Sequence, residues 1–260
     1  MTAQTTDRSK DHTICTGAAF ASATTVLFAS SLLFFVVALR NRLAATSPQE
    51  EDDDHITKST TDPRFGLTFL ICFVAFVSYY VMWFGHGHAQ VQRQNGGGGV
   101  SYMTAWARYA DWFITTPLLL LDLLWILGRS RPYDFASVLV LDVLMISLGL
   151  VAAFLVRSWP RYFMWALSTL AMLGVFASLL NFAYHPSEKN DDDNRVPDNE
   201  VIRFRKCLPW LLVLWSAYPL VWLLSKDGLD WLGTCSETTC YAILDVLSKA
   251  GFGAYLLSFS

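Results

Sequence analysis

Long apolar blocks alternate with polar segments along the whole chain. Seven blocks can be delimited, at about residues 16–39, 65–85, 102–127, 133–156, 162–184, 208–225 and 238–259. The segments between them are polar, as in residues 47–63 with their acidic run and in residues 185–200. A helix needs about 20 predominantly apolar residues to cross the hydrocarbon core of a bilayer. The pattern therefore predicts an all-α membrane protein, a seven-transmembrane helix bundle over residues 16–260 that follows an extracellular N-terminal tail, residues 1–15.

Composition narrows the class further. The chain has 260 residues, of which 53% are hydrophobic and 16% charged, whereas soluble proteins carry roughly 25% charged residues. The apolar excess excludes a disordered or collagen-like chain, and the net charge of -3 excludes a basic nucleic-acid binder. No metal-ligand pattern is visible, because His86 and His88 alone are a weak ligand pair. We expect the lipid bilayer as a partner and no bound metal.

Loop charges predict the orientation. Of the 19 Lys and Arg residues, 11 lie in the loops on one side, 6 in the loops on the other and 2 inside the spans. Because basic residues concentrate in cytoplasmic loops, the N-terminus is predicted outside and the C-terminus in the cytoplasm, with the plasma membrane as the expected location. Residues 1–15 are too polar to be expected to act as a cleavable signal peptide.

Three of the five cysteines fall on the predicted outer side. These are Cys15, Cys235 and Cys240, and a disulfide between two of them is chemically feasible in an oxidising compartment. No pairing can be chosen from the sequence. Cys72 and Cys207 lie in or beside apolar blocks and are expected to be packing residues.

A few ionisable side chains interrupt the apolar blocks. They are Arg108, Asp111 and Asp122 in the third block, Asp142 in the fourth, and Glu237, Asp245 and Lys249 in or beside the seventh. Such groups are costly in hydrocarbon, so a functional role is the default hypothesis. Asp111 and Asp122 are eleven residues apart, which is about three helical turns or roughly 16 Å along one face. Asp245 and Lys249 also share a face, so we expect four groups to meet at similar depth around one interior cavity, namely Arg108, Asp111, Asp245 and Lys249.

Lys249 carries the most specific chemistry. Desolvation favours the neutral amine of a buried lysine, which can form a Schiff base with an aldehyde. The resulting cation needs a carboxylate counterion, and Asp111 and Asp245 are both candidates. A purely structural set of buried ion pairs is the alternative, although desolvation offsets much of the Coulomb gain of such pairs. Asp122 lacks a cation partner in its own span, so we expect it to be protonated at rest and to mark a proton path.

Three segments resemble microbial (type 1) rhodopsins, and most closely the bacteriorhodopsin-type proton pumps. They read ARYADW at 107–112 with TTPLLLLD at 115–122, LWSAYP at 214–219, and LDVLSK at 244–249 followed by GFG at 251–253. The similarity extends over spans two to seven. The run Gly85-His86-Gly87 and the long acidic loops are more similar to fungal members than to archaeal ones.

The resemblance implies a light-driven outward proton pump, an ion transporter and photoreceptor and not an enzyme, with all-trans retinal bound to Lys249 as a protonated Schiff base. The proton path it implies comprises the primary acceptor Asp111, the counterion partners Asp245 and Arg108, the nearby hydrogen-bonding Thr115, the cytoplasmic donor Asp122 with its support Thr68, and the outer release carboxylates Asp227 and Glu237. The implied retinal pocket comprises Tyr79, Trp112, Thr116, Leu119, Met145, Gly149, Trp165, Ser168, Thr169, Met172, Trp215, Tyr218, Pro219, Trp222 and Ser248. Some relatives form trimers, so a homo-oligomer is an expectation of the same kind.

Two positions depart from the best-known pump of that family. Ser248 replaces a small apolar residue just before the lysine, and its hydroxyl is expected to stabilise positive charge near the Schiff base and to shift absorption to the blue. Lys226 is a cation beside Asp227 and could alter proton release. Two other functions stay open: a photosensory rhodopsin that signals through a partner, and a light-gated cation channel. Retention of Asp122 favours the pump over the sensor, and the intact outer carboxylates favour it over the channel.

Overall fold

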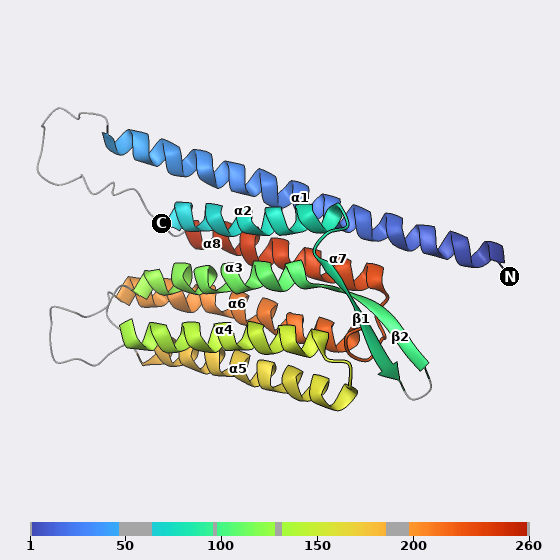
Figure 1. The fold of residues 1–260 in the computed structure, drawn as a ribbon. Coiled ribbons are helices and arrows are strands. Elements are labelled where there is room, and N and C mark those ends of the chain that lie inside the picture. The colour runs from blue at the N-terminus through green and yellow to red at the C-terminus, as the bar shows by residue number, and fades with distance from the viewer. Residues whose placement is uncertain (1, 47–63, 96–97, 128–131, 186–197, 259–260) are drawn as a thin grey trace, which may run out of the picture.

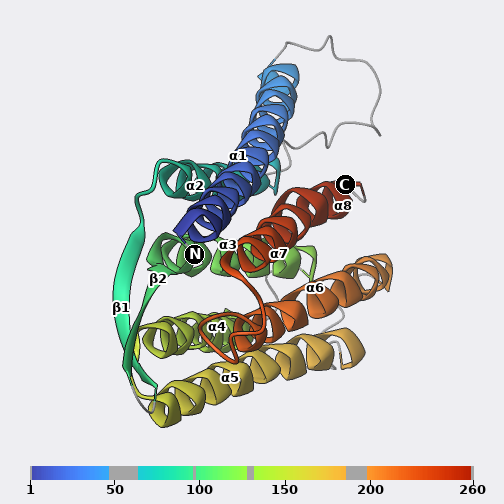
Figure 2. The same ribbon diagram turned by 90° about the vertical axis from the view of Figure 1, so that its right-hand side faces the viewer.

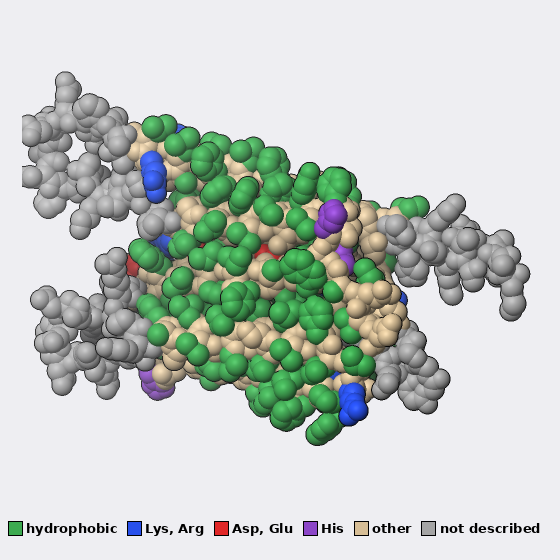
Figure 3. Space-filling model, viewed as in Figure 1, with side chains coloured by type: hydrophobic (Ala, Val, Ile, Leu, Met, Phe, Trp, Pro, Cys, Tyr) green, Lys and Arg blue, Asp and Glu red, His purple; other side chains and the backbone are tan. Residues whose placement is uncertain are grey.

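The structure, a computed structural model, describes residues 2–46, 64–95, 98–127, 132–185 and 198–258. Within these residues seven helices are long and apolar enough to cross a membrane, which confirms the predicted fold class. They lie side by side as a bundle with the two chain termini at opposite ends, as an odd number of spans requires (Figure 1). Hydrophobic side chains cover the visible flank, and Lys and Arg side chains lie toward its two ends (Figure 3). The chain is therefore an integral, multi-pass membrane protein, while the direction in which it crosses the membrane stays a prediction.

Neighbouring helices in the sequence pack against one another, and the last span closes the ring against the first (Figure 2). In chain order the helices are α1 (Thr2–Thr46), α2 (Arg64–Trp83), α3 (Trp106–Leu124) with the 3-10 turn η1 (Trp125–Leu127), α4 (Pro132–Phe154), α5 (Ser158–Tyr184), α6 (Asp198–Leu224) and α7 (Thr234–Val246). The seventh span continues through a π-helical turn, η3 (Leu247–Gly251), into α8 (Phe252–Leu257). Such wide turns occur frequently at functional sites, and this one contains Lys249.

A β-hairpin joins the second and third spans where only a polar loop was expected. Strand β1 (His88–Asn95) pairs antiparallel with β2 (Gly98–Ala105), and His88 lies opposite Ala105. The predicted third span is wrong for residues 102–105, because these belong to β2 and the helix begins at Trp106. The apolar character of Tyr102 and Met103 extended the hydropathy block into the strand.

Gly87 allows the chain to turn from α2 into β1 close to the start of α3. Its φ is +73°, a left-handed conformation that glycine adopts without steric cost. A Cβ at this position would lie 2.5 Å from the Cβ of Ala107. The carbonyl oxygen of Gly87 accepts a hydrogen bond from the amide of Ala107 at 3.1 Å, which fixes the hairpin to the first turn of α3.

Helices α1 and α6 extend further than the apolar blocks indicated. Helix α6 begins at Asp198 instead of at the predicted residue 208, and Asp198 and Glu200 in its first turn stabilise the positive end of the helix dipole. Val201 and Phe204 are buried in this added stretch, while its basic residues hid it from a hydropathy reading. The backbone of residues 2–15, predicted as a tail, is helical and continuous with α1.

A disulfide between Cys15 and Cys235 ties α1 to the first turn of α7, with the two Cα atoms 5.7 Å apart. This pairing decides what the sequence left open among Cys15, Cys235 and Cys240. Cys240 remains a free, partly buried thiol, and Cys72 and Cys207 are free and buried.

Candidate functional site

The amine of Lys249 lies between two carboxylates in the centre of the bundle. Its Nζ atom is 2.5 Å from Oδ2 of Asp111 on α3 and 3.0 Å from Oδ1 of Asp245 on α7. Lys249 and Asp111 are each 1% exposed and Asp245 is fully buried. The i to i+4 spacing on α7 and the shared depth of α3 and α7 thus bring together three of the four groups that were expected around one cavity. Arg108, the fourth, contacts Glu237 and Tyr241 of α7 instead.

The two carboxylates have unequal surroundings. Asp245 accepts hydrogen bonds from the hydroxyl of Tyr79 at 2.6 Å, the indole N–H of Trp112 at 3.0 Å and the hydroxyl of Tyr218 at 2.9 Å, in addition to Lys249. Oδ1 of Asp111 has no hydrogen-bond partner within the part of the chain that the structure describes. Hydrogen bonds to the charged form favour that form, so Asp245 is held as a carboxylate while Asp111 is freer to accept a proton.

Thr115 and Thr116 fix the same stretch of α3. The hydroxyl of Thr115 donates to the backbone carbonyl of Asp111 at 2.9 Å. The hydroxyl of Thr116 lies 2.9 Å from Oδ2 of Asp142 and ties α3 to α4. Both threonines are buried, and these contacts keep the carboxylate of Asp111 at one depth in the bundle.

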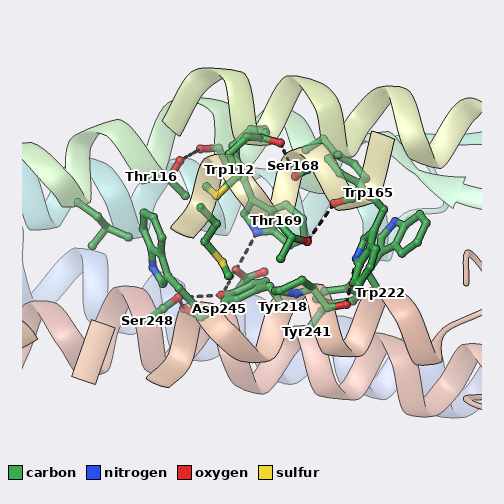
Figure 4. Close-up of a pocket in the computed structure, with 18 of the residues that line it drawn as sticks. Trp112, Thr116, Trp165, Ser168, Thr169, Tyr218, Trp222, Tyr241, Asp245 and Ser248 are labelled. Atoms are coloured by element: carbon green, nitrogen blue, oxygen red, sulfur yellow. Dashed lines mark hydrogen bonds between the residues drawn. The ribbon is translucent and has the colours of Figure 1, made fainter. Parts of the chain in front are cut away.

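A cavity lies beside Lys249, and its lining is predominantly apolar and aromatic with a few polar groups, as is usual for ligand pockets. Figure 4 shows aromatic rings and threonine, serine and methionine side chains around it. Every predicted pocket residue lines it except Tyr79, which bonds to Asp245 instead. Its remaining lining residues are Tyr109, Ile146, Tyr241 and Asp245, of which the first three were not expected there. Tyr109 and Tyr241 could have been predicted from helix spacing. Tyr109 shares a helix face with Trp112, and Tyr241 shares one with Asp245.

Interhelical hydrogen bonds hold the cavity walls in place (Figure 4). The indole N–H of Trp165 donates to the carbonyl of Pro219 at 3.2 Å, and the hydroxyl of Ser168 donates to the carbonyl of Met145 at 2.7 Å. The rings of Trp165 and Trp222 are stacked with centroids 6.1 Å apart. The chemistry of this lining suits an apolar molecule with an aldehyde at one end, because the amine of Lys249 stands in the wall.

Toward the C-terminus of the chain, the next ionisable group of α3 is Asp122. Its side chain is fully buried, and Oδ2 accepts a hydrogen bond from the hydroxyl of Thr68 on α2 at 3.1 Å. The adjacent positions Leu120, Leu123 and Leu124 are all completely buried. Asp122 therefore lies in an apolar layer and is paired with Thr68 as the sequence implied.

Toward the hairpin, Arg108 makes two contacts with α7. Its guanidinium is 3.8 Å from the carboxylate of Glu237 and stacks over the ring of Tyr241, with Cζ 4.2 Å from the centroid. Asp227 lies in the turn between α6 and α7, where its backbone N–H donates to Oγ of Ser225 at 3.0 Å. Its charge lies close enough to act on Glu237. The predicted release carboxylates and Arg108 are thus gathered at this end of the bundle.

His88 stands at the mouth of the same end. Nδ1 is 2.8 Å from the carbonyl oxygen of His86, and the ring contacts Phe20 of α1 edge to face. Partial burial lowers the pKa of the imidazole below its usual value of 6.5, with a further contribution from the positive charge of Arg108. The neutral form is therefore favoured at neutral pH.

Comparison with known proteins identifies the family. The family model for bacteriorhodopsin-like proteins matches residues 53–259. The chain belongs to the bacteriorhodopsin-like family. Retinal is the chromophore of this family, and the cavity with its buried lysine fits that group. Bacteriorhodopsin-like proteins are light-driven ion transporters, so the three recognised sequence segments led to the correct family.

Individual relatives support the same assignment. Bacteriorhodopsin-II of Haloarcula marismortui is 38% identical over 191 residues, covering 74% of this chain and 72% of the relative. The crystal structure of the light-driven proton pump LR (Mac) from Leptosphaeria maculans has a TM-score of 0.76 at 27% identity, covering 94% of this chain and 95% of that one. The thermophilic rhodopsin from Rubrobacter xylanophilus gives a TM-score of 0.76 at 29% identity over 94% and 95% of the two chains. A closer kinship with fungal members stays a prediction.

Proposed function

We propose that this bacteriorhodopsin-like protein is a light-driven outward proton pump that carries all-trans retinal as a protonated Schiff base on Lys249. The observation that carries the proposal is the inequality of the two carboxylates beside Lys249. Asp245 is saturated by donors from Tyr79, Trp112 and Tyr218, whereas Asp111 faces the lysine with one oxygen unbonded by any described residue. Proton transfer from Lys249 in a single direction requires this arrangement, in which one carboxylate stays an anion and the other accepts the proton.

When bound, retinal supplies light absorption and a light-driven change of shape at the Lys249 nitrogen. The proton held at this nitrogen passes to Asp111, 2.5 Å away in the resting arrangement. Asp245 keeps its negative charge and holds the site together through its hydrogen bonds. Asp111 then carries the proton on the hairpin side of Lys249.

A proton leaves from the group formed by Arg108, Glu237 and Asp227. Neutralisation of Asp111 removes a negative charge that attracted Arg108, so the guanidinium interacts more strongly with Glu237, 3.8 Å away. A stronger interaction with a cation favours the carboxylate form and expels the proton. Asp122 then returns a proton to the Lys249 nitrogen from the apolar layer on the opposite side, where Thr68 orients its carboxyl group.

Access must switch between these two steps. Pro219 lies inside α6 and removes one backbone hydrogen bond, so α6 has a built-in point for bending. The carbonyl of Pro219 is held by Trp165 on α5 in the resting arrangement. Tilting of the part of α6 that precedes Pro219 would open the apolar layer around Asp122 to the C-terminal end of the bundle.

A voltage series of photocurrents tests the proposal against its two rivals. The retinal-reconstituted protein is expected to give an outward current whose sign stays the same at every holding voltage, because light and not the gradient drives it. A current that reverses sign with voltage would show a channel, and light absorption without current would show a sensor. Lys249→Ala is the matched control, and it should lose both visible absorption and current.

A further inference from the structure

The Cys15–Cys235 disulfide lies two residues from Glu237, the carboxylate that contacts Arg108. Cys235 occupies the second position of α7, and Glu237 follows in the same turn. Tyr241, whose ring lies under the Arg108 guanidinium, is one turn further along. Both contacts between Arg108 and α7 therefore depend on where the first two turns of this helix are held.

No side chain caps the start of this first turn. Its N-cap residue is Gly233, which offers no side chain to the free amides of the helix, and Asp230, three residues earlier, has a φ of +58°. Helices usually gain stability from a side-chain cap at this position. The connection from α6 is held by the hydroxyl of Tyr162, which donates to the carbonyl of Gly228 at 3.0 Å, and by the amide of Leu232, which donates to the carbonyl of Leu224 at 2.8 Å. The disulfide is the covalent link that holds the helix start itself.

The disulfide joins α7 to a helix that is itself well packed. Phe20 and Leu27 of α1 are buried against the rest of the bundle. Cys15 and Cys235 are both partly buried, and their Cα separation of 5.7 Å is usual for a disulfide. A covalent bond to α1 thus replaces the missing cap as a fixed point for the start of α7.

We propose that the Cys15–Cys235 disulfide is a positioning element for the Arg108–Glu237 pair, and that it sets how fast a proton leaves on the hairpin side. The inference rests on the proposed pump function and adds a structural element that controls the rate of proton release. The Coulomb interaction between Arg108 and Glu237 weakens as the first turn of α7 drifts away from α3. Breaking the bond should therefore slow proton release and leave the Lys249 site unchanged.

The bond can be broken in two independent ways. The double variant Cys15→Ser with Cys235→Ser removes it without leaving an odd thiol, and Cys240→Ser is the matched control, because Cys240 is a free thiol on the same helix. In the wild-type protein a water-soluble phosphine cleaves the bond: the S–S bond breaks, two thiols form with protons from water, and the phosphine becomes its oxide. Alkylation followed by mass measurement on retinal-free protein should then count two additional thiols.

Proton release is followed with a pH-indicating dye in the medium after a light flash. We expect release to slow about fivefold in the double variant and in the reduced wild type, a size typical of coupling between a remote contact and a site. The pH profile of release should shift with it, while the absorption maximum and the recovery step through Asp122 stay the same. Cys240→Ser should behave as the wild type.

A second comparison separates positioning from general loosening. In a Glu237→Gln background, breaking the disulfide should have no further effect on release, since the two changes act through one contact. Unchanged release after the alkylation count has shown the bond to be broken would overturn the proposal. So would an equal slowing of every step of the light cycle, or an equal effect in the Glu237→Gln background. Absence of any light-driven proton movement in the intact wild type would instead contradict the pump function.

Discussion

The two halves of the bundle on either side of Lys249 differ in the polarity of their interior side chains. On the hairpin side, Arg108 contacts both Glu237 and Tyr241, and the turn that carries Asp227 lies at the same end. On the C-terminal side, Asp122 pairs with Thr68 among leucines that are completely buried. The first half is a connected set of polar groups, and the second is an apolar layer with a single carboxyl on α3.

This difference between the two halves shows how a helix bundle can favour proton transport in one direction. A polar set can shift a proton between its members with little cost, so in the proposed pump release on the hairpin side needs only a change in charge at Asp111. An apolar layer blocks proton movement until it opens, so the proposed pump needs a stored proton at Asp122 for refilling. The lysine stands at the boundary between the two, in the π-helical turn η3.

The largest effect is expected where the halves meet. Asp111→Asn removes the proton acceptor and leaves Asp245, which is already saturated with hydrogen bonds, so transport should fall below detection. General acid–base groups contribute about 10²–10⁴-fold to rates. External acidification by cells under light measures this, with Asp111→Glu as the control that keeps a carboxyl. Normal acidification by Asp111→Asn would show that the two carboxylates are not unequal as the geometry indicates.

Loss of the stored proton should be the next largest effect. Asp122→Asn should slow recovery after a flash by about 100-fold, with no change in the release step on the hairpin side. Recovery should also become slower as pH rises, because the proton must then come from solution. Flash photolysis across pH 5 to 9 checks this, and Thr68→Val should give a weaker form of the same defect. Recovery at the wild-type rate in Asp122→Asn would remove the C-terminal layer from the proton path.

A smaller effect, on the absorption maximum, tests the surroundings of Lys249 between the two halves. The hydroxyls of Ser248 and Tyr218 are 2.9 Å apart, and Tyr218 also donates to Asp245. Ser248→Ala removes a dipole that stabilises positive charge close to Lys249, so the absorption maximum of the retinal-bound variant should move to longer wavelength. Tyr218→Phe, which keeps the ring, serves as a comparison for the lost hydrogen bond. An unchanged or shorter wavelength in Ser248→Ala would contradict the predicted role of this serine.

The smallest effect concerns the mouth of the hairpin side. The pKa of His88 is lowered by partial burial and by Arg108, so the unfolded chain takes up a proton at this position more readily than the folded one. Stability should therefore fall as pH drops through 6.5, the usual value, and level off below the folded pKa. Thermal unfolding at pH 7.5 and 5 should show a slightly larger loss in the wild type than in His88→Gln. Equal losses would mean that His88 titrates as a solvent-exposed group.

Much of the site could be predicted from the sequence, because the relevant spacings lie within single helices. The i to i+4 spacing of Asp245 and Lys249 and the eleven-residue spacing of Asp111 and Asp122 depend only on helix geometry. Hydropathy located the spans for the same reason. It misplaced the starts of α3 and α6, because apolar residues of β2 and a charged but half-buried turn of α6 do not follow the rule that a membrane helix is uniformly apolar.

The sequence by itself determined that the chain crosses a membrane seven times and that Lys249 shares its depth with Asp111 and Asp245. Only the tertiary structure decided which of those carboxylates is saturated, since Tyr79, Trp112 and Tyr218 reach Asp245 from three other helices. It also decided that Cys15 pairs with Cys235, at a sequence separation of 220 residues. Spacing along one helix is fixed by covalent geometry, whereas contacts between helices depend on how the whole bundle packs.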